Sequence, residues 1–137
     1  MRLGPTAPRL WIAAVAGALA LVAACKRQLP PPDPDGKDLV AGAIVAATET
    51  VGGIRLYKIT QLDPIPDPAG DEYHMVAYDP KATSWEDAAA LYRDKRLKVA
   101  LPHILVRKVL FMTRDHRIVG AEAVTDDEKL AIRKSQR

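Results

Sequence analysis

A single cysteine carries the most distinctive chemistry in the sequence. Cys25 is the only thiol among 137 residues, so it has no partner for an intramolecular disulfide. It follows a fifteen-residue run without charge, residues 10–24, which itself follows a short segment that contains Arg2 and Arg9 but no acidic residue. As a helix this run would span ~22 Å, less than the ~30 Å hydrocarbon core of a membrane. The pattern is therefore typical of a cleaved signal peptide rather than of a permanent transmembrane helix.

The residues around the expected cleavage point indicate the type of signal peptide. They resemble the lipobox of bacterial lipoproteins, an aliphatic residue followed by small residues and a cysteine: Leu21, Val22, Ala23, Ala24 and Cys25. The resemblance covers residues 1–25 only. It implies that a diacylglycerol is attached to the Cys25 thiol, a soft nucleophile, and that a peptidase cuts between Ala24 and Cys25. It also implies a further acyl chain, such as palmitate, on the new amino group, and two or three chains hold a protein firmly on a bilayer.

The alternative is an ordinary secretory leader that is also cut after Ala24, with Cys25 there by chance. The single cysteine, its place at the end of the apolar run and the small residues before it favour the lipoprotein. In lipoproteins of this type an aspartate after the cysteine often retains the protein in the inner membrane, whereas this chain has Lys26. The resemblance thus predicts a lipid-anchored protein of the cell envelope that faces the periplasm, with the outer membrane favoured over the inner.

Composition divides the chain into three parts. Residues 1–24 form the predicted signal peptide, and residues 25–37 form a lipidated, proline-rich tether that could extend up to ~35 Å in the polyproline form. Residues 38–137 are long enough for one domain. The charge is uneven, because residues 25–90 carry 6 Lys or Arg against 11 Asp or Glu, whereas residues 91–137 carry 12 against 6. The C-terminal third is therefore locally basic.

The residue patterns of the domain predict an α+β fold. We expect a small antiparallel sheet of four to five strands, with one helix packed on one face and a short C-terminal helix. Branched and aromatic residues favour strands over residues 39–48, 54–62, 73–78, 104–113 and 117–124, although alanines leave a helix open for 39–48. Gly52-Gly53 and the polar residues 114–116 would close two hairpins. Capping-box patterns at Ser84 and at Thr125 predict the two helix starts.

The domain contains no recognisable catalytic, cofactor or metal motif, so we predict none of the three. His74, His103 and His116 are too far apart in sequence for a zinc signature. A metal site in the acidic loop, built from Asp63, Asp67, Asp71, Glu72 and His74, remains an alternative, but its spacing differs from that of a calcium loop. Turn-forming Asp-Pro pairs explain the loop more simply.

A basic stretch is the best candidate for an interaction surface. It comprises Arg107, Lys108, Arg114, His116 and Arg117, which the predicted second hairpin would bring together. An anionic glycan, a lipid or an acidic protein would fit this charge. The predicted localisation in the cell envelope argues against nucleic acid as the partner.

These observations predict a membrane-tethered, non-enzymatic interaction domain that contacts the bilayer through acylated Cys25 and an envelope protein or cell-wall partner through its surface. The alternative is a periplasmic ligand-binding or hydrolytic domain. Its pocket would lie between helix and sheet and would use Tyr57, Tyr73, His74 and Tyr92. A cavity with converging polar groups would favour this alternative.

Overall fold

A β-hairpin forms the middle of the sheet in the computed structural model, which describes residues 29–66 and 70–137; the predicted signal peptide and Cys25 lie outside the described residues. Strand β1 (Ala43–Thr48) pairs antiparallel with β2 (Ile54–Asp63). The turn between them contains Gly52 and Gly53 with φ of 93° and 82°, backbone angles that side chains with a Cβ rarely adopt. The first predicted hairpin is thereby confirmed, with a strand rather than a helix at 43–48.

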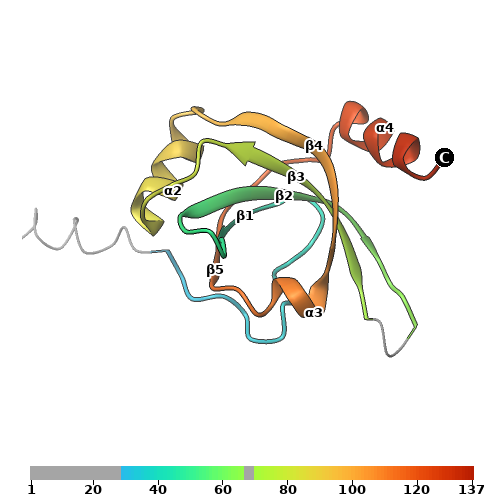
Figure 1. Ribbon diagram of the computed structural model, residues 1–137, viewed down its shortest axis with the longest axis horizontal. Helices are drawn as coiled ribbons and strands as arrows, with labels where there is room; N and C mark the ends of the chain where they lie inside the picture. The colour runs from blue at the N-terminus through green and yellow to red at the C-terminus, as the bar shows by residue number, and fades with distance from the viewer. Residues whose placement is uncertain (1–28, 67–69) are drawn as a thin grey trace, which may run out of the picture.

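Three further strands complete an antiparallel sheet in the order β4-β3-β2-β1-β5 (Figure 1). Strand β3 (Glu72–Asp79) pairs with β2, β4 (Lys98–Arg107) pairs with β3, and β5 (His116–Ala121) pairs with β1. Strands β4 and β5 are therefore the two edges of the sheet. This arrangement confirms the predicted α+β fold with a five-stranded sheet.

Within the described residues, three helices accompany the sheet: α2 (Trp85–Arg93), α3 (Lys108–Phe111) and α4 (Asp126–Ser135). Ser84 caps α2 by accepting a hydrogen bond from the backbone N–H of Asp87, and Thr125 with Glu128 forms the predicted capping box of α4. Both predicted helix starts are therefore confirmed. Across residues 29–66 and 70–137, none of the helices combines the length and the apolar character needed to span a bilayer.

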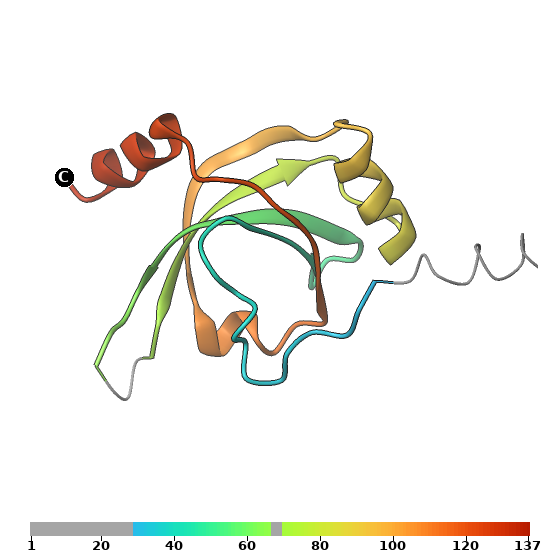
Figure 2. The same cartoon turned by 180° about the vertical axis from the view of Figure 1, so that it is seen from behind.

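The two faces of the sheet carry two separate apolar clusters. On the face we call inner, Val45, Tyr57, Ile59 and Met75 pack with Phe111 of α3. On the outer face, Ile44 and Ala46 of β1 and Leu56 of β2 pack against Ala88 and Leu91 of α2. Figures 1 and 2 show the sheet curving round the side that carries α3, with α4 projecting beyond β4. The alternation of side chains along each strand divides them between these two layers.

Residues 33–42 pack against the inner side of the domain. The Asp33 carboxylate accepts hydrogen bonds from the backbone N–H groups of Asp35 and Lys37, which closes a turn. Gly36, with φ of 69°, lies so close to Met112 that an added Cβ would be 3.0 Å from its sulfur. Leu39 is buried in the inner cluster. The second half of the proline-rich segment thus contacts the fold directly.

The second predicted hairpin is wrong. Strand β4 ends at Arg107, the short helix α3 follows, and β5 pairs with β1 at the opposite edge of the sheet from β4. Residues 104–113 and 117–124 therefore do not pair with each other. The physical reason is packing: Phe111 turns inward on α3 to contact Tyr57 edge-on, with ring centroids 6.0 Å apart, and this redirects the chain beneath the sheet.

Candidate functional site

A buried lysine holds the C-terminal helix on the outer face of the sheet. Lys58 lies in the middle of β2, and its side chain is only 2% exposed. Its Nζ donates to the carbonyl oxygen of Ala123, at 2.7 Å, and to Oε1 of Glu128, at 2.8 Å. The Glu128 side chain is 15% exposed. An ion pair this far from water must be well partnered, so these contacts bind the start of α4 to β2.

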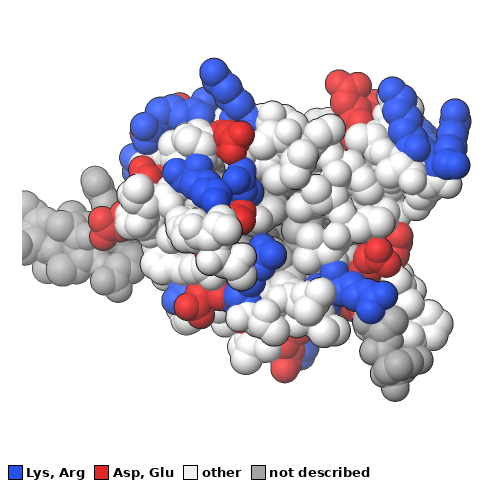
Figure 3. All heavy atoms as spheres, viewed as in Figure 1, with Lys and Arg blue, Asp and Glu red and all other residues white. Residues whose placement is uncertain are grey.

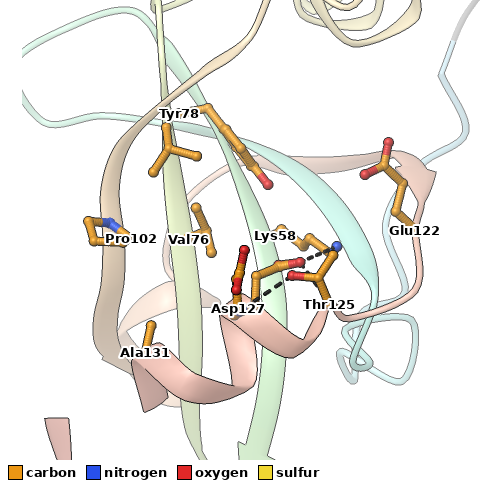
Figure 4. A pocket seen from close by; sticks show the side chains of 10 residues that line it. Lys58, Val76, Tyr78, Pro102, Glu122, Thr125, Asp127 and Ala131 are labelled. Carbon is orange, nitrogen blue, oxygen red and sulfur yellow. Dashed lines mark hydrogen bonds and ion pairs between the residues drawn. The ribbon is translucent and has the colours of Figure 1, made fainter. Parts of the chain in front are cut away.

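A pocket of about 320 Å³ lies beside this ion pair, between α4 and the sheet (Figure 4). Its apolar walls are Val76 of β3, Val99 and Pro102 of β4, and Ala131 of α4. Its polar lining comprises Lys58, Tyr78, Glu122, Thr125, Asp127 and Glu128. In the view of Figure 4, Lys58 and Thr125 lie between Asp127 and Glu122, whereas Val76, Pro102 and Ala131 lie on the other side of Asp127. The pocket therefore has an apolar side and a polar side.

The polar groups of the pocket give it a negative charge. The positive charge of Lys58 neutralises the charge of Glu128, whereas the other two carboxylates of the lining, Glu122 and Asp127, have no such counter-charge in the pocket lining. Burial opposes ionisation of Glu128, but hydrogen bonds from Lys58 and Thr125 outweigh burial and lower its pKa. Oε2 of Glu128 is nevertheless buried and has no hydrogen-bond partner among the residues that the structure describes. A buried acceptor without a donor is unfavourable, so a donor brought into this site would stabilise it.

The phenol of Tyr78 also reflects this negative environment. Burial, followed by the charges of Glu128 and Glu122, raises its pKa to about 12. Tyr78 and Glu122 line a second hollow of about 170 Å³ as well, together with Tyr92 and Lys95 at the end of α2. The two hollows thus adjoin along the outer face between α2 and α4.

The four residues proposed from sequence for one pocket lie in four different settings. Tyr92 lines the smaller outer hollow, where burial and then Glu122 raise its pKa. Tyr57 lines a hollow of about 390 Å³ on the inner face and donates to Oε1 of Glu49 at 2.8 Å. Tyr73 is buried in the inner core. The pocket beside α4 contains none of these four residues, including His74.

The fourth residue, His74, belongs to a hydrogen-bonded chain of three side chains. Its Nε2 is 2.6 Å from Oδ2 of Asp63, and its Nδ1 is 2.8 Å from Nε2 of His103. When His74 is neutral, its Nε2–H donates to the carboxylate, and its Nδ1 accepts the Nε2–H of His103. His74 is buried, whereas His103 is half-buried. Two histidines distant in sequence are thereby joined to an acid of the predicted loop.

This chain predicts a pH dependence of stability. Burial, followed by the positive charge of His74, lowers the pKa of His103 below its ordinary value of 6.5. Between that lowered pKa and about pH 7 the unfolded chain binds more protons than the folded chain, so stability falls as the pH decreases through this window. Urea unfolding from pH 7.5 to 5 should show this fall, and His103→Gln should flatten it.

Two features of the pH experiment keep its outcome clear. The pKa of Asp63 is lowered chiefly by its hydrogen bond with His74, so its stabilisation is present above pH 3.8 and disappears only at more acidic pH. The pH range in which Asp63 affects stability therefore lies below the pH range in which His103 does. A His103→Gln chain whose stability depends on pH as strongly as the wild type would contradict the assignment.

The edge strand β4 exposes apolar side chains on both faces of the sheet. Val99, Leu101 and Leu105 are 58%, 53% and 52% exposed, with Val99 lining the outer-face pocket and Leu101 the inner-face hollow. Val109 and Leu110 of α3 are exposed as well. Figure 3 shows an area without charged side chains between those around α2 and those on α4. In the part of the chain that the structure describes, no strand pairs with the outer side of β4. Unpaired backbone groups and apolar side chains therefore lie together along this edge.

The basic residues predicted as an interaction surface have different surroundings in the structure. Arg107 is exposed at the end of β4, whereas Arg114 donates to the Tyr57 hydroxyl at 3.4 Å. Arg117 of β5 stacks on Trp85 of α2, 5.0 Å from the ring centroid. His116 is 3% exposed. Lys108 begins α3. Because β4 and β5 lie at opposite edges of the sheet, the predicted hairpin that was to bring these residues together does not form. The interaction surface itself stays a prediction.

Comparison with known proteins adds no relationship: no family model matches the chain, and neither does any curated protein or solved structure. Over residues 29–66 and 70–137, no three His, Cys, Asp or Glu side chains gather in an arrangement that could hold a metal ion. Residues 67–69 of the acidic loop lie outside the description, and the alternative metal site there includes Asp67.

Sequence reasoning overlooked two of these features, although each has a signal. Lys58 lies between Leu56 and Thr60, which share its face of the strand, so a buried charge in need of a partner could have been expected. Residues 98–107 (KVALPHILVR) form an apolar run with Pro102 inside it. A proline within such a run is typical of an edge strand.

Proposed function

We propose that this chain is a lipid-anchored, non-enzymatic interaction domain of the bacterial cell envelope that binds an extended segment of a partner protein along β4. One observation carries the proposal: a ten-residue edge strand with three apolar side chains more than half exposed. Long apolar edges are normally covered or guarded by charge, because they pair readily with other strands. Addition of a partner strand would pair the free backbone groups and cover these side chains.

The opposite edge is a weaker candidate. Strand β5 has six residues, and none of the exposed large apolar side chains among the described residues lies on it. It also packs beneath α2 through the stacking of Arg117 on Trp85. Along β4, Pro102 lacks one backbone donor and divides the edge into residues 98–101 and 103–107. Each window is long enough for a short partner strand.

The charges at the ends of β4 favour a different protein over a second copy of this chain. In a full-length antiparallel pairing of two β4 strands, Lys98 of one copy would face Arg107 of the other at both ends. Like charges directly opposite each other destabilise a strand pair. A partner segment with apolar residues in its middle and acidic residues at its ends would instead complement Lys98 and Arg107. The expected partner is therefore an extended, acid-flanked segment of an envelope protein.

The proposed anchor rests on the lipobox resemblance at residues 21–25. A tether to the membrane confines the domain near other envelope proteins and raises its effective concentration toward them. A weak strand-to-strand contact can then be sufficient, because neither protein has to find the other by diffusion through a large volume. The proposed anchor would thus allow a low-affinity contact at the exposed edge of β4 to be effective.

Replacing the expected acylation site tests the anchor. In cells fed an alkyne fatty acid, we expect the wild-type chain to be labelled and to sediment with membranes, whereas Cys25→Ser should lose at least 90% of both signals. The reason is that each buried methylene contributes ~0.8 kcal/mol, and serine accepts no thioether-linked lipid. Lys26→Ser, which leaves the thiol in place, is the matched control. Equal labelling of wild type and Cys25→Ser would refute the lipoprotein assignment.

A further inference from the structure

Hollows lie against β4 on both faces of the sheet. The outer one is the pocket beside α4, of about 320 Å³, and Val99 and Pro102 of β4 form part of its lining. The inner one, of about 390 Å³, is lined by Ala100, Leu101 and Ile104 of the same strand. Because β4 is an edge of the sheet, a strand added to it would have a hollow beside it on each face.

An extra residue in β4 turns its exposed apolar side chains to both faces. Ala77 and Tyr78 are adjacent in β3, whereas their partners in β4, Leu101 and Val99, are two positions apart. Residues two positions apart in a regular strand point to the same face, but the extra residue sends Val99 to the outer face and Leu101 to the inner. An added strand whose own side chains alternate regularly would therefore meet the two hollows with neighbouring residues.

The outer pocket presents its apolar side to β4. In the view of Figure 4, Val76, Pro102 and Ala131 lie together, apart from Lys58 and Thr125. Pro102 belongs to β4, so a side chain that comes from beyond this edge meets the apolar side of the pocket first. A branched aliphatic side chain suits these walls, because it buries apolar area without taking a polar group out of water.

The inner hollow contains a guanidinium group whose orientation is fixed. Arg55 donates from Nε to Oε1 of Glu49 and from Nη1 to Oδ1 of Asp79, both at 2.6 Å. Leu101 and Ile104 form the apolar wall on the β4 side. A planar guanidinium stacks well on an aromatic ring. A side chain from an added strand must also extend past β4 to reach Arg55 on β2, so a large aromatic side chain fits this hollow best.

From this arrangement we propose that the partner segment carries two neighbouring side chains of different kinds, a large aromatic one for the inner hollow and a branched aliphatic one for the outer pocket. The inference rests on the proposed strand addition at β4 and specifies the sequence that the added strand carries. Neighbouring residues of a strand point to opposite faces, so the pair enters both hollows at once. Pairing of the main chains gives affinity for extended segments in general, and the aromatic–aliphatic pair selects one segment among them.

Two acid-flanked peptides of identical composition test the pair. In the peptide DETTWITTED the tryptophan and the isoleucine are neighbours, whereas in DETWTITTED they are two positions apart and point to the same face. Each peptide is titrated into the isotope-labelled full chain. The NMR signals of Val76 and Ala131 report on the outer pocket, and those of Ala77 and Ile104 report on the inner hollow. We expect the first peptide to shift both pairs of signals and to bind at least tenfold more tightly than the second.

Matched variants test the two hollows separately. Ala131→Leu places a larger side chain in the outer pocket and should weaken binding of the first peptide at least tenfold. Lys129→Leu, on the same helix but outside the pocket lining, should leave binding unchanged. Arg55→Lys keeps the charge of the inner hollow but removes the planar group. It should weaken the first peptide at least threefold and should not weaken a peptide with leucine in place of tryptophan.

The outcomes distinguish this inference from the strand addition on which it rests. Equal binding of the two peptides, with backbone shifts along residues 103–107, would overturn the aromatic–aliphatic pair and leave strand addition in place. No shift along β4 with either peptide would contradict strand addition as well. Unchanged binding by both Ala131→Leu and Arg55→Lys would overturn the assignment of the two side chains to these hollows.

Discussion

Lys58→Met is expected to lower the free energy of unfolding by about 3–5 kcal/mol, the usual cost of breaking a buried ion pair. The substitution leaves the Glu128 carboxylate, 15% exposed, without its cation, and the carbonyl of Ala123 without its donor. Small domains are stable by only about 5–15 kcal/mol, so this is a large share of the total. Urea unfolding measures the loss, and faster hydrogen exchange over α4 should accompany it.

A second substitution separates the charge effect from loss of packing. In Lys58→Met with Glu128→Gln the unpaired buried charge is gone, and glutamine can still complete the capping box with Thr125. The double variant should therefore be more stable than Lys58→Met alone. Lys129→Met, an exposed lysine on the same helix, should change stability by about 0.5 kcal/mol or less. If the double variant were less stable than Lys58→Met, the ion pair would not be what anchors α4.

Leu101→Lys combined with Leu105→Lys is expected to reduce partner capture at least tenfold without unfolding the domain. Both side chains are more than half exposed, so lysine is tolerated there, whereas charge along an edge strand deters pairing with another strand. The measurement is the amount of partner recovered with the chain after chemical crosslinking in intact cells. Thermal unfolding of the purified variant verifies that the fold is retained.

A distant lysine substitution controls for charge alone. Val51, in the turn between β1 and β2, is 80% exposed and apolar like the edge residues. Val51→Lys should leave partner capture unchanged. If it reduced capture as much as the β4 variant does, a general charge effect rather than the edge of the sheet would account for the loss.

The elements that the sequence predicted correctly depend on short-range interactions. The turn at Gly52-Gly53 joins neighbouring strands, and the caps at Ser84 and Thr125 involve residues three positions apart. Such features follow from local backbone chemistry. The alternation of apolar residues likewise placed β2 and β3 close to their observed bounds.

The incorrect predictions depend on long-range packing. The prediction of the second hairpin was wrong because β5 pairs with β1, which lies some seventy positions earlier in the sequence; His116, for instance, pairs with Ala47. Burial of Phe111 on the inner face turned the expected continuous strand into α3. The ion pair of Lys58 with Glu128 and the chain from Asp63 to His103 likewise join residues that only the folded sheet brings together. The candidate sites in this domain therefore form only when the sheet topology brings residues distant in sequence together.

Site-specific photo-crosslinking along β4 tests the central claim most directly. A photoreactive residue is placed in turn at positions 105 and 107, where β4 follows a regular register with β3, and the crosslinked partner residues are mapped by mass spectrometry. Strand addition predicts products with one segment of one protein, with the crosslinked residue moving by two positions when the probe moves by two. No product at either position, or products scattered over unrelated segments, would contradict the proposal that β4 receives a partner strand.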